Sequence, residues 1–344
     1  MNNNSTVRLF LSVFVFLLTA ACFTVAEAQE KISFSGYGAT GIKIYDRNKL
    51  RKYNQETYYE GKLQADIKIN KDIDAQVDMR GSSEDGRMIL REFSVKFDYF
   101  KYMKIKAGNL KKPFGQEQLL NTEDLPTIDR SYIRNVISDF GYGGRSVSLM
   151  AYYNYKEKNP EFPFSYYISF FKDNSLFTGT AARLAYHNSG IAYALNYQLQ
   201  NKGGEEKITT YGMSADISLE NNGYYASLEG IYAQDPIESI RRRNYMGIDK
   251  KVFTAGLKAT VSANYAVGGR IVESVEPVIL GGLYIPDSDK DEYRTYEVLA
   301  GVNVYLDKDV RLRLNGDALF TKNLYDDDYS TIGSKVIAEI QVKF

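Results

Sequence analysis

Apolar and polar residues alternate one by one through most of the chain. In residues 61–70 (GKLQADIKIN), every second position from Leu63 to Ile69 is apolar, and the positions between carry charged or amide side chains. Successive side chains of a strand point to opposite faces, so such a segment predicts a strand with one apolar and one polar face. A helix would need apolar residues three and four positions apart, and these segments do not show that spacing.

Sixteen segments predict strands of this kind. They span about 31–46, 57–70, 73–82, 88–100, 103–112, 143–156, 163–173, 179–188, 190–201, 207–220, 223–234, 250–263, 266–279, 292–306, 310–322 and 333–344. The tight connections fall at 71–72, 101–102, 188–189, 221–222, 264–265 and 307–309. The longer ones fall between them, at 47–56, 113–142, 235–249, 280–291 and 323–332. Short turns at one end and long loops at the other are typical of a transmembrane β-barrel.

The last ten residues, 335–344 (KVIAEIQVKF), predict the strand that closes the barrel. Every second residue from Val336 to Phe344 is apolar, and the residues between are polar except for Ile337. An open edge in lipid would leave backbone groups unpaired, so this strand should pair with the first strand, near 31–45. We expect the terminal aromatic residue Phe344 to act as an assembly signal for the barrel-insertion machinery rather than in transport.

The predicted fold is therefore all-β, a transmembrane antiparallel barrel of about 16 strands. A barrel of that size encloses an aqueous channel, whereas one of about eight strands encloses only side chains.

The amino end predicts export. Arg8 precedes an apolar run over 9–25, and 26–28 (AEA) has the small-x-small pattern of a cleavage site. This arrangement is typical of a secretory signal peptide, here 1–28, with the barrel domain in 29–344.

The amino end has two alternative interpretations. A membrane-anchoring helix would need a longer apolar run. Lipidation at Cys22 would need a Leu where Thr19 stands. After cleavage at the predicted site no cysteine remains, which excludes disulfides, thiol catalysis and cysteine metal sites.

Composition narrows the class further. The chain has 43 basic and 43 acidic residues and a net charge of zero, which argues against nucleic acid as a partner. It has 29 Tyr, no Trp and 7 Pro. Abundant Tyr suits the aromatic girdles of a barrel, whose partners would be outer-membrane lipid and lipopolysaccharide.

The longest connection, 113–142, contains many apolar residues that need a surface to pack against. We expect it to fold into the lumen as a constriction loop. Short helical turns could begin at Thr122 or Thr127. An extracellular flap that covers a neighbouring subunit is the alternative.

Residues 106–115 (KAGNLKKPFG), followed by Asp129-Arg130-Ser131, resemble the phosphate-selective porin O and P family. In that family a similar strand end leads into the constriction loop, and an acidic-Arg-Ser element follows. The resemblance implies a sixteen-stranded porin, a homotrimer, with the constriction loop inside the pore.

Charges on the predicted lumen faces nearly balance, with eleven basic and ten acidic residues. The candidate pore-lining residues are Lys62, Lys68, Lys96, Lys258, Arg311 and Arg313. Around the constriction the balance is basic. The candidate constriction residues are Lys104, Lys106, Lys111, Lys112, Arg130, Arg134 and Arg145, against five acidic residues. Basic residues at a narrow point favour anions, so a weak anion preference is predicted; the alternative is that these charges pair and stiffen the loop.

The run Arg241-Arg242-Arg243 lies in a long loop. It could bind an anionic solute or lipopolysaccharide phosphates, or it could be solvated with Asp235 and Glu238 as counter-charges.

The predicted function is an outer-membrane porin, a passive diffusion channel for small hydrophilic solutes or ions, without cofactor or metal. The chain has one histidine, His187, and lacks the hydrolase and phosphate-loop motifs, so no enzyme is predicted. A non-conducting barrel with a binding or adhesion role is the alternative.

Overall fold

The computed structural model describes residues 31–46, 53–83, 86–155, 162–173, 177–203, 207–290, 294–322 and 329–344. The predicted signal peptide lies outside these residues.

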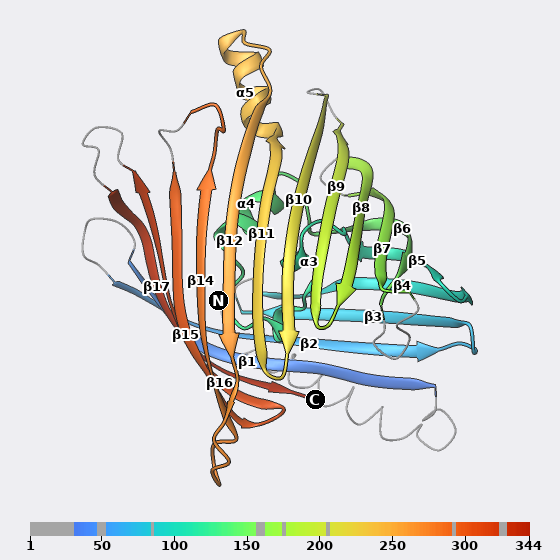
Figure 1. The fold of residues 1–344 in the computed structure, drawn as a ribbon, viewed down its shortest axis with the longest axis vertical. Coiled ribbons are helices and arrows are strands. Elements are labelled where there is room, and N and C mark those ends of the chain that lie inside the picture. The colour runs from blue at the N-terminus through green and yellow to red at the C-terminus, as the bar shows by residue number, and fades with distance from the viewer. Residues whose placement is uncertain are drawn as a thin grey trace, which may run out of the picture.

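The described residues form a single antiparallel sheet (Figure 1). Its strands are β1 Ile32–Asp46, β2 Tyr53–Lys68, β3 Ile73–Ser82, β4 Arg87–Phe100, β5 Met103–Lys111, β6 Arg145–Tyr153, β7 Phe164–Lys172, β8 Phe177–Asn188, β9 Ile191–Lys202, β10 Ile208–Asn221, β11 Tyr224–Asp235, β12 Val252–Ala263, β13 Tyr265–Ala266, β14 Ser274–Ile285, β15 Thr295–Asp307, β16 Val310–Lys322 and β17 Tyr329–Lys343. The helical segments are α3 Gln116–Leu119, the 3-10 turn η1 Thr122–Asp124, α4 Tyr132–Asp139 and α5 Pro236–Met246.

The sheet closes on itself. β1 pairs with both β2 and β17, and the backbones of Phe344 and Gly36 exchange two hydrogen bonds of 3.1 and 3.0 Å. β12 pairs directly with β14, and β13 is a two-residue extension of that hairpin. The described wall therefore has sixteen long strands, which confirms the predicted antiparallel barrel.

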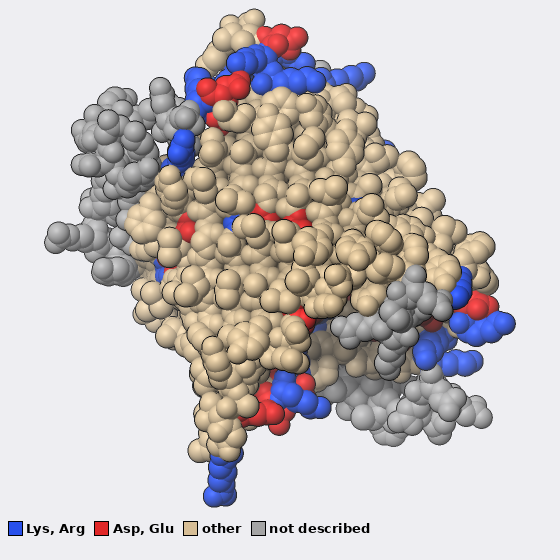
Figure 2. All heavy atoms as spheres, viewed as in Figure 1, with Lys and Arg blue, Asp and Glu red and all other residues tan. Residues whose placement is uncertain are grey.

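The two faces of the closing strand follow its sequence pattern. Val336, Ile340 and Val342 are exposed on the outer face, while Glu339 is buried on the inner face. Ile337, which broke the alternation, also faces inward and packs in a small apolar cluster with Tyr58 and Ile128. Figure 2 shows the outer surface, where charged side chains gather toward the two ends of the barrel.

One predicted strand was misplaced. The thirteenth strand was predicted at 266–279 with a tight turn at 264–265, but β14 begins at Ser274 and runs to Ile285. The hairpin turns later, where Gly268 has a φ of 63° and Val267 N donates to Glu273 O at 2.8 Å. The glycine pair 268–269 therefore breaks the segment that was predicted as one strand, and the next connection begins only after Ile285.

Long and short connections lie at opposite ends of the barrel. Turns at 101–102, 189–190, 222–223 and 308–309 share one end with Lys31 and Phe344; we call it the short-turn end. The opposite, long-loop end carries α5 and the connection from β5 to β6. Among the described residues, no helix is both long and apolar enough to cross a membrane.

Deleting Phe344 should reduce the amount of barrel inserted into membranes. Its side chain is 61% exposed on the outer surface, so it contributes nothing to the lumen. Heat-modifiable migration of membrane extracts measures the assembled fraction, and the variant Phe344→Tyr, which keeps a terminal aromatic ring, is the control. Wild-type yield after the deletion, or altered conductance of the surviving barrels, would contradict this assignment.

Candidate functional site

The connection from β5 to β6, residues 112–144, lies inside the barrel, where α3 and α4 are surrounded by strands (Figure 1). Its apolar side chains pack against the inner wall in a buried cluster. The loop contributes Phe114, Ile133, Ile137, Phe140 and Tyr142, and the wall contributes Ile231, Ala233 and Tyr284. The predicted internal loop is confirmed, and burial of these side chains explains why the loop is apolar.

Glycines in the wall make room for this packing. A Cβ atom on Gly256 of β12 would lie 2.8 Å from Ile133 Cγ2, and one on Gly212 of β10 would lie 2.8 Å from Tyr142 Cε1. Both distances are too short for a real Cβ contact, so a larger residue at either position would displace the loop side chain that packs there.

A buried ion cluster fixes the start of the loop. Glu117 pairs with Lys258 of β12 and accepts hydrogen bonds from Ser131 N at 2.9 Å and Ser131 Oγ at 2.6 Å. Lys258 also pairs with Glu229 of β11 at 3.1 Å. Burial opposes ionisation of Glu117, but the charge of Lys258 and these hydrogen bonds outweigh it and lower the pKa of Glu117 to about 2.

Two arginines of β16 hold the middle of the loop through its carbonyl groups. Arg311 Nη2 donates to Glu123 O at 2.7 Å, and Arg313 Nη2 donates to Leu125 O at 2.9 Å. Arg313 also pairs with Glu339 of β17 at 3.1 Å. These arginines and Lys258 face inward as predicted for pore-lining residues, but the loop covers them, so they serve as its anchors.

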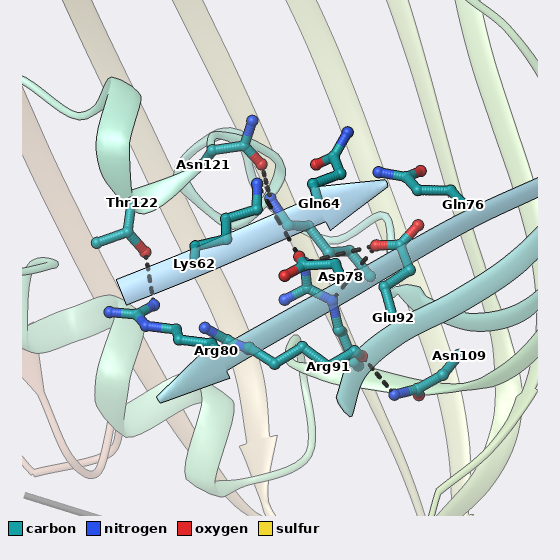
Figure 3. A network of polar contacts seen from close by, with 12 residues as sticks. Lys62, Gln64, Gln76, Asp78, Arg80, Arg91, Glu92, Asn109, Asn121 and Thr122 are labelled. Atoms are coloured by element: carbon teal, nitrogen blue, oxygen red, sulfur yellow. Dashed lines mark hydrogen bonds and ion pairs between the residues drawn. The ribbon is translucent and has the colours of Figure 1, made fainter. Parts of the chain in front are cut away.

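A polar pocket lies between the loop and strands β2 to β6, and we call this pocket the opening. The opening is lined by Lys62, Asp78, Arg80, Arg91, Lys111, Gln118, Asn121, Thr122, Glu123, Arg130, Arg134, Gly144 and Arg145. Seven of these residues are basic and two are acidic. Figure 3 shows Lys62, Arg80 and Arg91 of the wall beside Asn121 and Thr122 of the loop.

Three of the seven cations have a carboxylate partner. Lys62 pairs with Glu123 at 2.7 Å, Arg145 pairs with Asp78 at 3.5 Å, and Arg80 pairs with Glu60.

The other four cations have no carboxylate partner among the described residues. Lys111 Nζ donates to the carbonyls of Leu119 and Leu120 at 3.0 and 2.9 Å, and Arg130 Nη2 donates to Leu120 O at 2.8 Å. Arg134 Nε donates to Gln118 Oε1 at 3.1 Å. The guanidinium of Arg91 makes no hydrogen bond or ion pair within the described part of the chain.

The uncompensated charges repel one another. Burial and then the charge of Arg134 lower the pKa of Arg130 to about 10. Burial also lowers the pKa of Arg134, and Arg91 acts in the same direction. An anion in the opening would relieve this repulsion, and a cation would increase it.

Arg91 reaches the opening through a β-bulge, which sequence reasoning missed. Asp78 pairs with Glu92 and Met79 with Leu90, so Arg91 is the extra residue of β4. Strict alternation from the lipid-facing Phe93 would have turned Arg91 toward lipid. A charged side chain that faces lipid costs free energy. This cost was the one feature of the sequence that could have indicated the bulge.

Several predicted constriction residues lie away from the opening. Lys104 pairs with Asp98, and Lys106 pairs with Glu92 at 2.6 Å. Lys112 is 2% exposed at the base of the loop, where it pairs with Asp173 at 3.1 Å. Of the remaining predicted pore-lining residues, Lys96 pairs with Asp74, while Lys68 is exposed near the short-turn end.

Known proteins give two kinds of match. Residues 58–225 match the profile of the family described as Phosphate-selective porin O and P. The match contains the 106–115 segment and the Asp129-Arg130-Ser131 element, so the resemblance is confirmed. No curated protein matches the sequence.

Three similar solved structures are a porin and two outer-membrane proteins. An anion-selective porin from Comamonas acidovorans is 15% identical, with a TM-score of 0.66 and 91% of this chain and 99% of that chain covered. The outer membrane channel DcaP of Acinetobacter baumannii is 10% identical, with a TM-score of 0.64 and coverages of 91% and 97%. OmpT of Vibrio cholerae in its trimer form is 10% identical, with a TM-score of 0.59 and coverages of 91% and 99%. At these identities the likeness shows the shared fold.

Proposed function

We propose that this chain, whose residues 58–225 match the phosphate-selective porin O and P family, is an outer-membrane diffusion channel that prefers small anions at its constriction. The family and the barrel support the channel role and the outer-membrane location. The anion preference rests on one observation. Four cations at the opening lack a carboxylate partner among the described residues: Arg91, Lys111, Arg130 and Arg134.

The preference is expected to be modest. Other lumen charges form ion pairs, such as Lys106 with Glu92 and Arg183 with Asp216, and contribute little net field. Field from the uncompensated cations is concentrated where the pore is narrow and low-dielectric walls surround it. The similar anion-selective porin from Comamonas acidovorans is consistent with this proposal.

Liposome swelling tests the anion preference. Sugar acids should enter porin-containing liposomes faster than neutral sugars of the same size, because the opening attracts their charge. The difference should shrink at high salt, where the Debye length falls to about 3 Å at 1 M. Equal or slower entry of the anion at low salt would overturn the preference.

A non-conducting barrel is the second candidate, because the loop is attached to the wall at several points, including Lys258, Arg311 and Arg313. Single-channel recording in planar bilayers separates the two: a diffusion channel gives stepwise current increases, and a closed barrel gives none.

Absence of catalysis stays a prediction. His187 lies 2.8 Å from Ser165 Oγ and stacks on Tyr155, and no carboxylate among the described residues is recorded in contact with it.

We also propose that the barrel assembles as a homotrimer in the outer membrane. A homotrimer is supported by the trimer form of the Vibrio cholerae OmpT structure. Export through a signal peptide at 1–28, insertion by the barrel-assembly machinery and contact with lipopolysaccharide complete the proposal.

A further inference from the structure

An aromatic patch marks the outer surface near the long-loop end of β10, β11 and β12. Its members are Tyr211, Tyr232 and Phe253, with Phe253 5.4 Å from Tyr211 and 5.0 Å from Tyr232 between ring centroids. Tyr232 lies between the inward-facing Ile231 and Ala233, so the patch faces outward. Aromatic rings on the outer face of a barrel gather at the boundary between hydrocarbon and headgroups.

A helix with both ends capped, α5, lies beyond this patch at the long-loop end. In α5, Asp235 caps the first turn by accepting from Ile237 N at 2.8 Å and Glu238 N at 2.9 Å. Gly247 ends the helix with a φ of 65°. The capped helix therefore places its arginines at the long-loop end, where Figure 2 shows basic and acidic side chains gathered.

Three basic residues of this region are neutralised by carboxylates. Arg241 pairs with Glu238 at 2.6 Å, Arg242 pairs with Asp287 at 2.8 Å, and Lys250 pairs with Asp289 at 2.8 Å. The run Arg241-Arg242-Arg243 is thus divided, with two of its three members held by carboxylates.

Three cations remain, Lys207, Arg243 and Lys251, which we call the rim cations. Lys251 Nζ lies 5.7 Å from the centre of the Tyr211 ring. Arg243 Nη1 lies 3.5 Å from the carbonyl oxygen of Lys207. None of the three pairs with a carboxylate among the described residues, so charge remains directly beyond the aromatic patch.

We propose that the rim cations bind the phosphate groups of lipopolysaccharide, whose acyl chains would pack over Tyr211, Tyr232 and Phe253. Lys and Arg form strong charge-assisted hydrogen bonds with phosphate oxygens. In an outer-membrane barrel the long loops face the cell exterior, which places the rim cations at the headgroup level of the outer leaflet. This site rests on the proposed outer-membrane location and is independent of the anion preference.

The test measures the affinity of the purified barrel in detergent for lipopolysaccharide. The triple variant Lys207→Gln, Arg243→Gln, Lys251→Gln should bind about tenfold or more weakly, which corresponds to about 1.4 kcal/mol. The matched control Lys71→Gln, Arg270→Gln, Lys308→Gln removes three exposed cations at the short-turn end and should bind like the wild type.

Two further arms identify the ligand. Dephosphorylated lipopolysaccharide should bind the wild type as weakly as intact lipopolysaccharide binds the rim variant, and inorganic phosphate at equal concentration should not displace the lipid. If the rim variant or the dephosphorylated lipid bound as tightly as the wild type binds intact lipopolysaccharide, the proposed site would be wrong. Displacement of the lipid by inorganic phosphate would show that the site binds free anions instead. Single-channel conductance and ion selectivity should be unchanged in the rim variant, so failure of the lipid site and failure of the channel proposal give different results.

Discussion

Reversing three charges at the constriction, in the variant Arg91→Glu, Arg130→Glu, Arg134→Glu, should convert an anion-preferring channel into a cation-preferring one. The opening is lined by seven basic and two acidic residues, a formal charge of 7 − 2 = +5. The variant has four basic and five acidic residues there, a formal charge of 4 − 5 = −1. Because the field is strongest at the narrow point, the sign of the zero-current potential in a salt gradient should invert.

Two companion variants separate charge from structure. Arg91→Gln removes a guanidinium that makes no hydrogen bond within the described residues, so it should reduce the anion preference without disturbing the loop. Lys68→Gln removes a cation near the short-turn end and should leave the potential close to that of the wild type. An unchanged potential in the triple variant would mean that selectivity is set elsewhere in the pore.

Replacing the loop anchor, in the variant Lys258→Met, should destabilise the barrel and loosen the constriction. The substitution leaves Glu117 and Glu229 buried with no cation between them. Breaking a buried ion cluster in this way costs about 3–5 kcal/mol. We expect a lower unfolding temperature together with a larger and noisier single-channel conductance, because the start of the loop detaches from β11 and β12.

The matched control is the triple variant Lys258→Met, Glu117→Gln, Glu229→Gln. It removes the two stranded charges and should recover much of the lost stability. If Lys258→Met alone kept the wild-type unfolding temperature and conductance, the remaining contacts of the loop, such as those of Arg311 and Arg313, would be sufficient to hold it.

Most of the fold could be predicted from the alternation of apolar and polar residues, because a strand side chain must face either lipid or the lumen. The closing strand shows this well: its outer face could be assigned from 335–344 alone, and even the exceptional Ile337 has an inward partner in Ile128. The segment 106–115 identified where the constriction loop begins for a similar reason, since that pattern is local.

The incorrect parts of the sequence-based prediction depend on structural features that the alternation of apolar and polar residues does not reveal. A bulge at Arg91 shifts one residue across the sheet, and the turn at Gly268 divides a segment that looked continuous. Which wall the loop rests on is set by contacts between residues far apart in the chain, such as Glu117 with Lys258. For this reason Lys258, Arg311 and Arg313 were expected along open water, whereas the loop covers them.

We propose that the uncompensated cations at the constriction favour anions. The most direct measurement is the zero-current potential of single wild-type channels in a planar bilayer with unequal KCl concentrations on the two sides. We predict a potential of the sign set by chloride flowing down its gradient, with a magnitude that falls as total salt rises. A potential of the sign set by potassium, at low salt and with the channel intact, would contradict it.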